Sequence, residues 1–293
     1  MKIPVVTNRA AGAKDDSPLL VEAFRKAGCE IEIVACSGEE VVAAARRGAE
    51  GPSPLVVAAG GDGTISAVAG ALAGSDKVLG VVPSGTLNHF ARDMGIPLEM
   101  AEAARVAVEG RTVRIDVAEV NGRAFINNSS LGFYSSLVRD REVIRSRDGR
   151  GKWSALFRAG VNLLRRAPTV AVRVMTAEGE IARRTPLLFV GNNRYDVSGW
   201  SLGKRARLDG GELFVCVLPV RSGARLVALG LRALLFPRGV SRQLLELAVS
   251  ECWVDLPDSA SLVSADGELH RLRPPLHYRL RPRALSVRVP RRA

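Results

Sequence analysis

The chain has 293 residues and is 47% hydrophobic, which is enough to bury the cores of two modest domains or one large one. Its apolar stretches, such as Leu226–Phe236 with Arg232 inside it, are shorter than the roughly 20 residues that span a bilayer. The strand-like start at Ile3 lacks the basic and apolar regions of a secretory signal, so the sequence predicts a cytoplasmic protein without a transmembrane helix.

The net charge of +12 is unevenly distributed along the chain. Residues 1–112 carry 11 Lys and Arg against 14 Asp and Glu, a net of −3, whereas residues 113–293 carry 31 against 16, a net of +15. A basic field favours nucleic acid or an anionic membrane leaflet, or is a solvated surface without a specific partner. Aromatic residues make up only 5% of the chain and do not interleave with the basic runs. The sequence therefore argues against nucleic acid as a partner.

The first third of the chain alternates strand and helix patterns, which predicts a mostly parallel sheet with helices on both faces. We expect Ser17 to be the N-cap of the first helix and Gly28 to end it, and Gly48 to end the second helix. The expected strands are 3–7, 31–33, 55–59 and 78–82, and the expected helices are 17–28, 39–47, 65–73 and 98–109.

After about residue 112 the pattern changes to strands joined by hairpin signals such as Asn121-Gly122. The polar and charged interval 138–151 is expected to be a mobile segment. The expected strands are 113–120, 123–127, 169–176, 181–184, 186–191, 212–218 and 277–289, and the expected helices are 152–166 and 223–236.

The strongest local signal is the run Gly60-Gly61-Asp62-Gly63-Thr64, which lies between an apolar strand and a helical run. Glycines let backbone N–H groups approach phosphate oxygens, and the following helix directs its positive end at the same anion. Thr64 is expected to cap that helix, and Asp62 to orient Mg²⁺ or a reacting hydroxyl. Because no Walker-A lysine is present, this is not an ordinary P-loop. A tight structural turn is the alternative.

A second loop of small residues follows the next strand and contains Ser84, Gly85, Thr86 and Asn88. The first three residues offer hydroxyl and backbone donors at the carboxyl end of a strand, where α/β sheets bind ligands. Asn88 either bridges this loop to a ligand or caps a helix.

Together these loops resemble the catalytic domain shared by diacylglycerol, sphingosine and ceramide kinases and their bacterial relatives, and the resemblance spans nearly the whole chain. The opening run 6–12 looks like the family's first nucleotide loop, with Arg9 in place of the usual proline. His89 stands where the family often has an aspartate, and Ala35-Cys36-Ser37 where it often has a threonine. The ATP-binding residues that the resemblance implies are Asn8, Gly12, Gly60, Gly61, Asp62, Gly63, Thr64, Ser84, Gly85, Thr86 and Asn88.

Acidic residues in the second half extend the resemblance. The run 208–213 resembles a segment that helps to hold a structural Mg²⁺, with Gly210 in place of a second acid, so that Asp209 is left as its carboxylate. Asp266-Gly267-Glu268 matches a motif near the chain end, which implies that Glu268 accepts the proton of the lipid hydroxyl. Asp266 is implied as metal-linked support or as the alternative base. Turns between strands are the alternative for both segments. The candidate catalytic residues are Glu268, Asp266 and Asp62, and the candidate metal ligands are Asp209, Asp266 and Glu268.

We therefore expect an α/β fold with an N-terminal Rossmann-like parallel-sheet nucleotide domain and a C-terminal β-sandwich domain. The expected boundaries are 1–112 for the ATP-binding domain, with a C-terminal return of about 276–293, and 113–275 for the β-rich lipid-acceptor domain. The expected function is transfer of the γ-phosphate of ATP, with Mg²⁺, to the hydroxyl of a diacylglycerol-like or related lipid.

Two other functions are kept beside this one: an NAD kinase-like enzyme, whose family shares the Gly-Gly-Asp-Gly-Thr loop, and a non-catalytic nucleotide- or lipid-binding protein. The expected partners are the lipid substrate and an anionic membrane surface, with the protein cytoplasmic and transiently membrane-associated. The sequence leaves open which lipid is phosphorylated and the oligomeric state, a homodimer included.

Overall fold

The computed structural model describes residues 2–8, 16–38, 40–132, 169–196, 204–218, 220 and 244–291. It divides into two compact units: 1–117 with 123–127 and 281–293, and 118–122 with 128–280. From the sequence we expect the boundary between the domains at residue 112, and the return of the chain to the first domain at about residue 276. The expected mobile segment 138–151 and the expected helices 152–166 and 223–236 lie outside the described residues.

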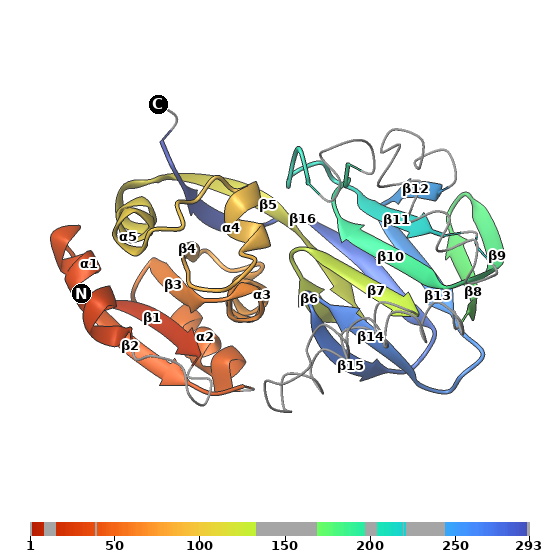
Figure 1. Ribbon diagram of the computed structural model, residues 1–293, viewed down its shortest axis with the longest axis horizontal. Coiled ribbons are helices and arrows are strands. Elements are labelled where there is room, and N and C mark those ends of the chain that lie inside the picture. Colours follow the sequence, from red (N-terminus) through yellow and green to blue (C-terminus); the bar gives the residue numbers. More distant parts are fainter. Residues whose placement is uncertain are drawn as a thin grey trace, which may run out of the picture. The chain divides into compact units, whose positions relative to one another are not determined.

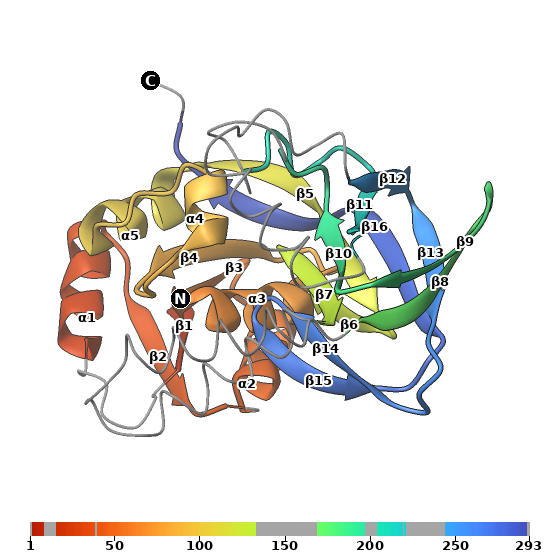
Figure 2. The ribbon, with the colours of Figure 1, turned by 45° about the vertical axis from the view of Figure 1, so that its right-hand side comes forward.

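The first unit is built on a parallel sheet in the order β2-β1-β3-β4, to which the final part of β16 adds beside β4. All six residues of β3 are buried, as expected for a central strand covered on both faces. Helix α1 packs with α5 and helix α2 with α3, which places one pair on each side of the sheet (Figure 2). The elements are β1 Ile3–Asn8, α1 Ser17–Lys26, β2 Ile31–Cys36, α2 Glu40–Glu50, β3 Leu55–Gly60, α3 Asp62–Leu72, β4 Val78–Pro83, α4 His89–Asp93, α5 Met100–Glu109, β5 Arg111–Val120, β6 Arg123–Phe125 and β16 Leu276–Val289.

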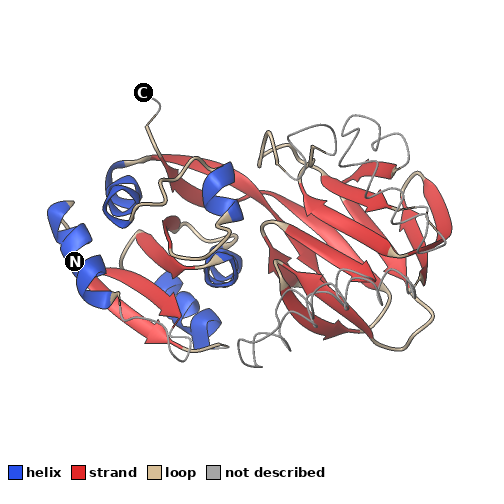
Figure 3. Cartoon of the chain, in the orientation of Figure 1, coloured by secondary structure: helices blue, strands red, loops and turns tan. Residues whose placement is uncertain are grey.

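The second unit contains two layers of antiparallel strands, labelled in Figure 1. One layer has the order β12-β11-β10-β7-β14-β15, and the other joins the first part of β16 to β13, β8 and β9. Among the described residues, all helices belong to the first unit, so the second is strand and loop (Figure 3). The remaining strands are β7 Asn128–Gly132, β8 Val170–Thr176, β9 Gly179–Thr185, β10 Leu187–Asn192, β11 Leu213–Val217, β12 Leu245–Val249, β13 Glu251–Asp255, β14 Ser261–Ala265 and β15 Glu268–Leu272.

The two layers of the second unit meet at a buried polar contact. The hydroxyl oxygen of Tyr278 on β16 lies 3.1 Å from that of Ser129 on β7, and both residues are fully buried. Burial raises the pKa of Tyr278 well above its usual value, because a phenolate would lose its hydration there. The observed α/β and β-sandwich architecture confirms the predicted fold class.

Several predicted helix boundaries are wrong by a few residues. Ser17 is the first helical residue rather than the N-cap, which is Asp16. Gly48 does not end α2, which continues to Glu50. A Cβ at Gly48 would come within 3.3 Å of Val56, so this glycine allows the helix to approach β3 closely. Gly28 does follow the end of α1, with a positive φ of 77°, as a C-terminal glycine should.

No helix in the described ranges is long and apolar enough to cross a membrane.

Candidate phosphate-binding site

The candidate nucleotide residues of the first unit follow the carboxyl ends of its parallel strands. The strand order changes direction between β1 and β3, and loops at such a switch point are the usual ligand sites of open α/β sheets. Asn8 ends β1 and is exposed, and Gly60 ends β3. Gly12 lies outside the described residues.

The loop after β3 turns directly into a helix. Gly61 is the N-cap and α3 begins at Asp62, three residues earlier than the expected start at Ile65. The expected capping role of Thr64 is therefore wrong, because Thr64 lies in the first turn and is buried. A Cβ at Gly60 would lie only 2.7 Å from the Cβ of Thr64, so this tight turn needs glycine. The first N–H groups of such a helix lack intrahelical acceptors and favour an anion.

The loop after β4 lies directly against the first loop. The backbone N–H of Ser84 donates to the carbonyl oxygen of Gly60 at 2.9 Å. A Cβ at Gly85 would lie 2.7 Å from the Cα of Gly61, so the two glycine backbones are in contact. The two strand ends thus bring both small-residue loops predicted from sequence into one place.

Asn88 closes the second loop on itself. Its Oδ1 accepts from the N–H of Gly85 at 3.0 Å, and its Nδ2 donates to the carbonyl oxygen of Gly85 at 2.8 Å. The residue is buried and has a left-handed φ of 51°, a conformation that asparagine tolerates better than most residues. Asn88 occupies the N-cap position of α4, but its side chain bonds the loop instead of capping the helix.

Asp62 joins the first loop to α4. Its Oδ1 accepts a hydrogen bond from the N–H of Phe90 at 3.3 Å, and Phe90 itself is fully buried. One carboxylate oxygen is therefore engaged with the backbone. His89 begins α4 and is exposed, as expected for a residue at a helix start.

We call the two loops together the phosphate cradle, because their groups have the chemistry to receive an anion. Backbone N–H groups of the α3 first turn lie beside a loop on which Ser84 and Thr86 are exposed. Such a combination of small residues, hydroxyls and amide donors suits phosphate oxygens.

The second unit holds the other candidate acids on a hairpin. Asp266 and Gly267 form the two-residue turn between β14 and β15, with φ values of 48° and 84°, as in a type I′ turn. The turn is tied to β7: the Oδ1 of Asp266 accepts from the N–H of Asn128 at 3.0 Å, and the N–H of Asp266 donates to the carbonyl oxygen of Asn128 at 2.8 Å. Glu268 begins β15 with its side chain 60% exposed and 3.9 Å from the Nε2 of His270.

Asp209 is not part of a cluster of metal-ligating side chains among the described residues. Its Oδ1 pairs with the Nε of Arg207 at 3.1 Å, and the N–H of the neighbouring Gly210 donates to the Oδ1 of Asn193 at 2.7 Å. Within the described ranges, no three or more His, Cys, Asp or Glu side chains gather to hold a metal. Single carboxylates of this kind fit a Mg²⁺ ion that is bound mainly by substrate phosphates and water.

The sequence reasoning missed a buried polar group around the end of β10. Asn192, Asn193 and Arg205 are buried. The Nη1 of Arg205 donates to the carbonyl oxygen of Asn192 at 3.2 Å, and the guanidinium lies over the ring of Tyr195 at 5.3 Å. A signal was present in the sequence, because the polar run 192–196 directly follows the expected strand 186–191.

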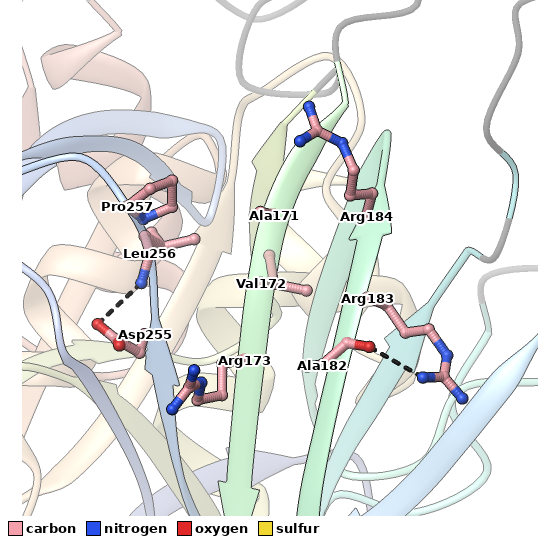
Figure 4. A pocket seen from close by; sticks show the side chains of 9 residues that line it. All are labelled: Ala171, Val172, Arg173, Ala182, Arg183, Arg184, Asp255, Leu256 and Pro257. Atoms are coloured by element: carbon pink, nitrogen blue, oxygen red, sulfur yellow. Dashed lines mark hydrogen bonds between the residues drawn. The ribbon is translucent and has the colours of Figure 1, made fainter.

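A hollow of about 460 Å³ lies in the second unit between β8, β9 and the end of β13 (Figure 4). Two of the polar side chains that line it have local partners: Asp255 accepts from the N–H of Leu256, and Arg183 donates to the carbonyl oxygen of Ala182. Because none of the candidate site residues lines it, we do not place the site there.

The chain is similar over most of its length to proteins that are named lipid or diacylglycerol kinases. The diacylglycerol kinase catalytic domain matches residues 2–120. A Pseudomonas aeruginosa protein named "Probable lipid kinase YegS-like" is 32% identical over 239 residues, 80% of this chain and 76% of its own length. A Klebsiella pneumoniae protein of the same name is 51% identical over 88 residues, so this chain matches only 30% of that relative. The crystal structure of a diacylglycerol kinase from Bacillus anthracis shares the fold, with a TM-score of 0.69 at 19% identity over 98% of this chain and 96% of that one.

Proposed function

Since the chain belongs to the lipid kinase family that carries the diacylglycerol kinase catalytic domain, we propose that it transfers the γ-phosphate of ATP to the hydroxyl of a diacylglycerol-like lipid. The observation that carries the proposal is the pair of interlocked loops at the ends of β3 and β4. They supply backbone donors and hydroxyls for phosphate. Glycines stand where the two loop backbones touch, so no side chain there keeps the loops apart.

The first unit's part in the reaction is to bind and orient the phosphates. Phosphoryl transfer needs positioning and compensation of charge on the transferred group more than covalent help from the protein. The N–H groups at the start of α3 and the hydroxyls of Ser84 and Thr86 serve that purpose. Asn8, at the end of the neighbouring strand β1, is the proposed contact on the other side of the switch point.

The second unit's part is to activate the acceptor. In the proposed step the lipid oxygen forms a bond to the γ-phosphorus, the bond from that phosphorus to the bridging oxygen of ADP breaks, and the hydroxyl proton passes to the carboxylate of Glu268. Glu268 suits this role because its side chain is largely exposed and is held on a β-strand. Asp266 lies in the turn that precedes Glu268, and its two hydrogen bonds with Asn128 fix that turn to β7.

Mg²⁺ is proposed to accompany ATP, where it would offset phosphate charge. The proposed contacts to it are the carboxylates of Asp209, Asp266 and Glu268. Magnesium commonly keeps several waters and needs only one or two protein carboxylates.

A membrane-surface role is proposed from charge. The second half of the chain has a net charge of +15, and each surface Lys or Arg contributes about 1 kcal/mol of attraction to an anionic leaflet. Binding to vesicles with anionic lipid should weaken as salt rises. Equal binding to neutral and anionic vesicles at low salt would contradict this role.

The function is tested by incubating the protein with γ-labelled ATP and either extracted lipids or NAD. Label in the lipid fraction is the expected result. Label in NADP would show an NAD kinase-like enzyme, and binding without transfer to either acceptor would show a non-catalytic protein.

A further inference from the structure

Side-chain hydrogen bonds close the second loop of the phosphate cradle on itself and tie α4 to the first loop. We call these contacts the loop latch: the hydrogen bond from the N–H of Phe90 to Asp62, and the two hydrogen bonds between Asn88 and the backbone of Gly85. We infer that Asp62 is a positioning residue, which acts by holding α4 and the second loop against the first. The inference rests on the proposed function, because it assigns a role within the proposed nucleotide site.

The first support is the geometry of Asp62. It stands at the first position of α3, yet its Oδ1 reaches a backbone N–H that is 28 positions further along the chain. A carboxylate that receives a backbone N–H is partly satisfied there. The hydrogen bond gives the Asp62 carboxylate a structural partner on α4, which is what a positioning role requires.

The second support is the burial of Phe90 and Asn88, which lie on the second-loop side of the hydrogen bond to Asp62. Phe90 is fully buried and lies in α4, so the amide that Asp62 binds belongs to a packed helix. Asn88, two residues earlier, is buried as well and fixes Gly85 on both its N–H and its carbonyl. Asp62 and Asn88 therefore bind opposite ends of one short stretch of chain.

The third support is the distance between the loops. A Cβ at Gly85 would lie 2.7 Å from the Cα of Gly61 and 3.6 Å from the N of Asp62. The donors at the start of α3 and those of the second loop are thus held at a fixed spacing. A small separation of the loops would change how both could contact one phosphate, and misplacement of about 1 Å is costly in catalysis.

The test compares Asp62→Asn with Asp62→Ala in the full chain. Asparagine keeps an oxygen that can accept from Phe90 but has no charge, whereas alanine removes the acceptor. We expect Asp62→Ala to raise the Kd for ATP about tenfold or more with a smaller effect on kcat, and to speed amide hydrogen exchange across residues 84–93 without nucleotide. Asp62→Asn should restore slow exchange in that segment and most of the ATP affinity. Asp76→Asn and Asp76→Ala are matched controls, since Asp76 is exposed in the turn before β4.

The opposite pattern would overturn the inference. If Asp62→Asn loses kcat as fully as Asp62→Ala while its exchange across 84–93 stays like the parent's, Asp62 acts through its charge. Unchanged exchange in Asp62→Ala would also overturn it. Asp62→Ser, a smaller change in polarity, replaces Asp62→Ala if that variant does not fold. Failure of the parent to bind ATP would contradict the proposed function, whereas the exchange data would still decide whether the latch holds the loops.

Discussion

Replacing Gly85 by alanine should separate the two loops of the cradle. The new Cβ would lie 2.7 Å from the Cα of Gly61 and 2.9 Å from the Oδ1 of Asn88. Carbon atoms in good contact are about 3.5–4.0 Å apart, so one loop must move by about 1 Å. Because the nearer atom belongs to the backbone, a side-chain rotation cannot relieve the clash.

The cost follows from the bonds that such a shift would stretch. The hydrogen bonds of Asn88 to Gly85 and of Ser84 to Gly60 are 2.8–3.0 Å long. Overpacking typically costs about 1–3 kcal/mol. We therefore expect a loss of about 2 kcal/mol, or roughly 3 °C in melting temperature for a chain of this size. Because the displaced loop donors would no longer fit one phosphate, we also expect ATP affinity to fall by about tenfold, which corresponds to about 1.4 kcal/mol of binding free energy.

The assay is thermal unfolding together with ATP titration of parent, Gly85→Ala and Gly61→Ala. Gly61→Ala is the steric control for stability, since its Cβ would meet nothing closer than 3.4 Å and its φ is −82°. Its melting temperature should stay near that of the parent. If Gly85→Ala melts with the parent and binds ATP equally well, the close approach of the loops does not matter and the cradle argument is wrong.

Three further outcomes are expected. Glu268→Gln should slow single-turnover transfer by about 10²- to 10⁴-fold with little change in ATP affinity; a rate within about threefold of the parent would leave Asp62 or Asp266 as the better candidate base. Asp266→Ala should lower the free energy of unfolding by about 1–3 kcal/mol, because the N–H of Asn128 loses its acceptor, whereas Asp266→Asn should retain most of it in denaturant titration. Burial raises the pKa of the Cys252 thiol from 9.0 to about 12, so stability should be complete below pH 9 and fall as the pH rises from 9 towards 12, and Cys252→Ala should flatten that fall.

The sequence revealed the parts of the cradle whose signal is local. Gly60 to Thr64 and Ser84 to Thr86 each follow an apolar strand, and the parallel order of those strands brings their ends together. The exact start of α3 was misjudged, because Thr64 has the chemistry of a capping residue while the turn at Gly60 and Gly61 actually begins the helix.

Contacts between distant positions could not be read from spacing. The bond from Phe90 to Asp62 and the bond from Asn128 to Asp266 join residues 28 and 138 positions apart. Each depends on how strands are ordered in a sheet, which residue pattern alone does not specify. The same reason explains Gly48, which looked like a helix end and instead lets α2 pack on Val56.

The most direct test of the account is the fate of the γ-phosphate when parent, Gly85→Ala and Glu268→Gln are given labelled ATP and diacylglycerol in mixed vesicles, with NAD in a parallel reaction. We predict that the parent labels the lipid phase and that both variants label it little. Of the two variants, only Glu268→Gln should still bind ATP like the parent. Label in NADP, or lipid labelling that is equal in all three proteins, would contradict the claim that these loops and this carboxylate form a lipid kinase.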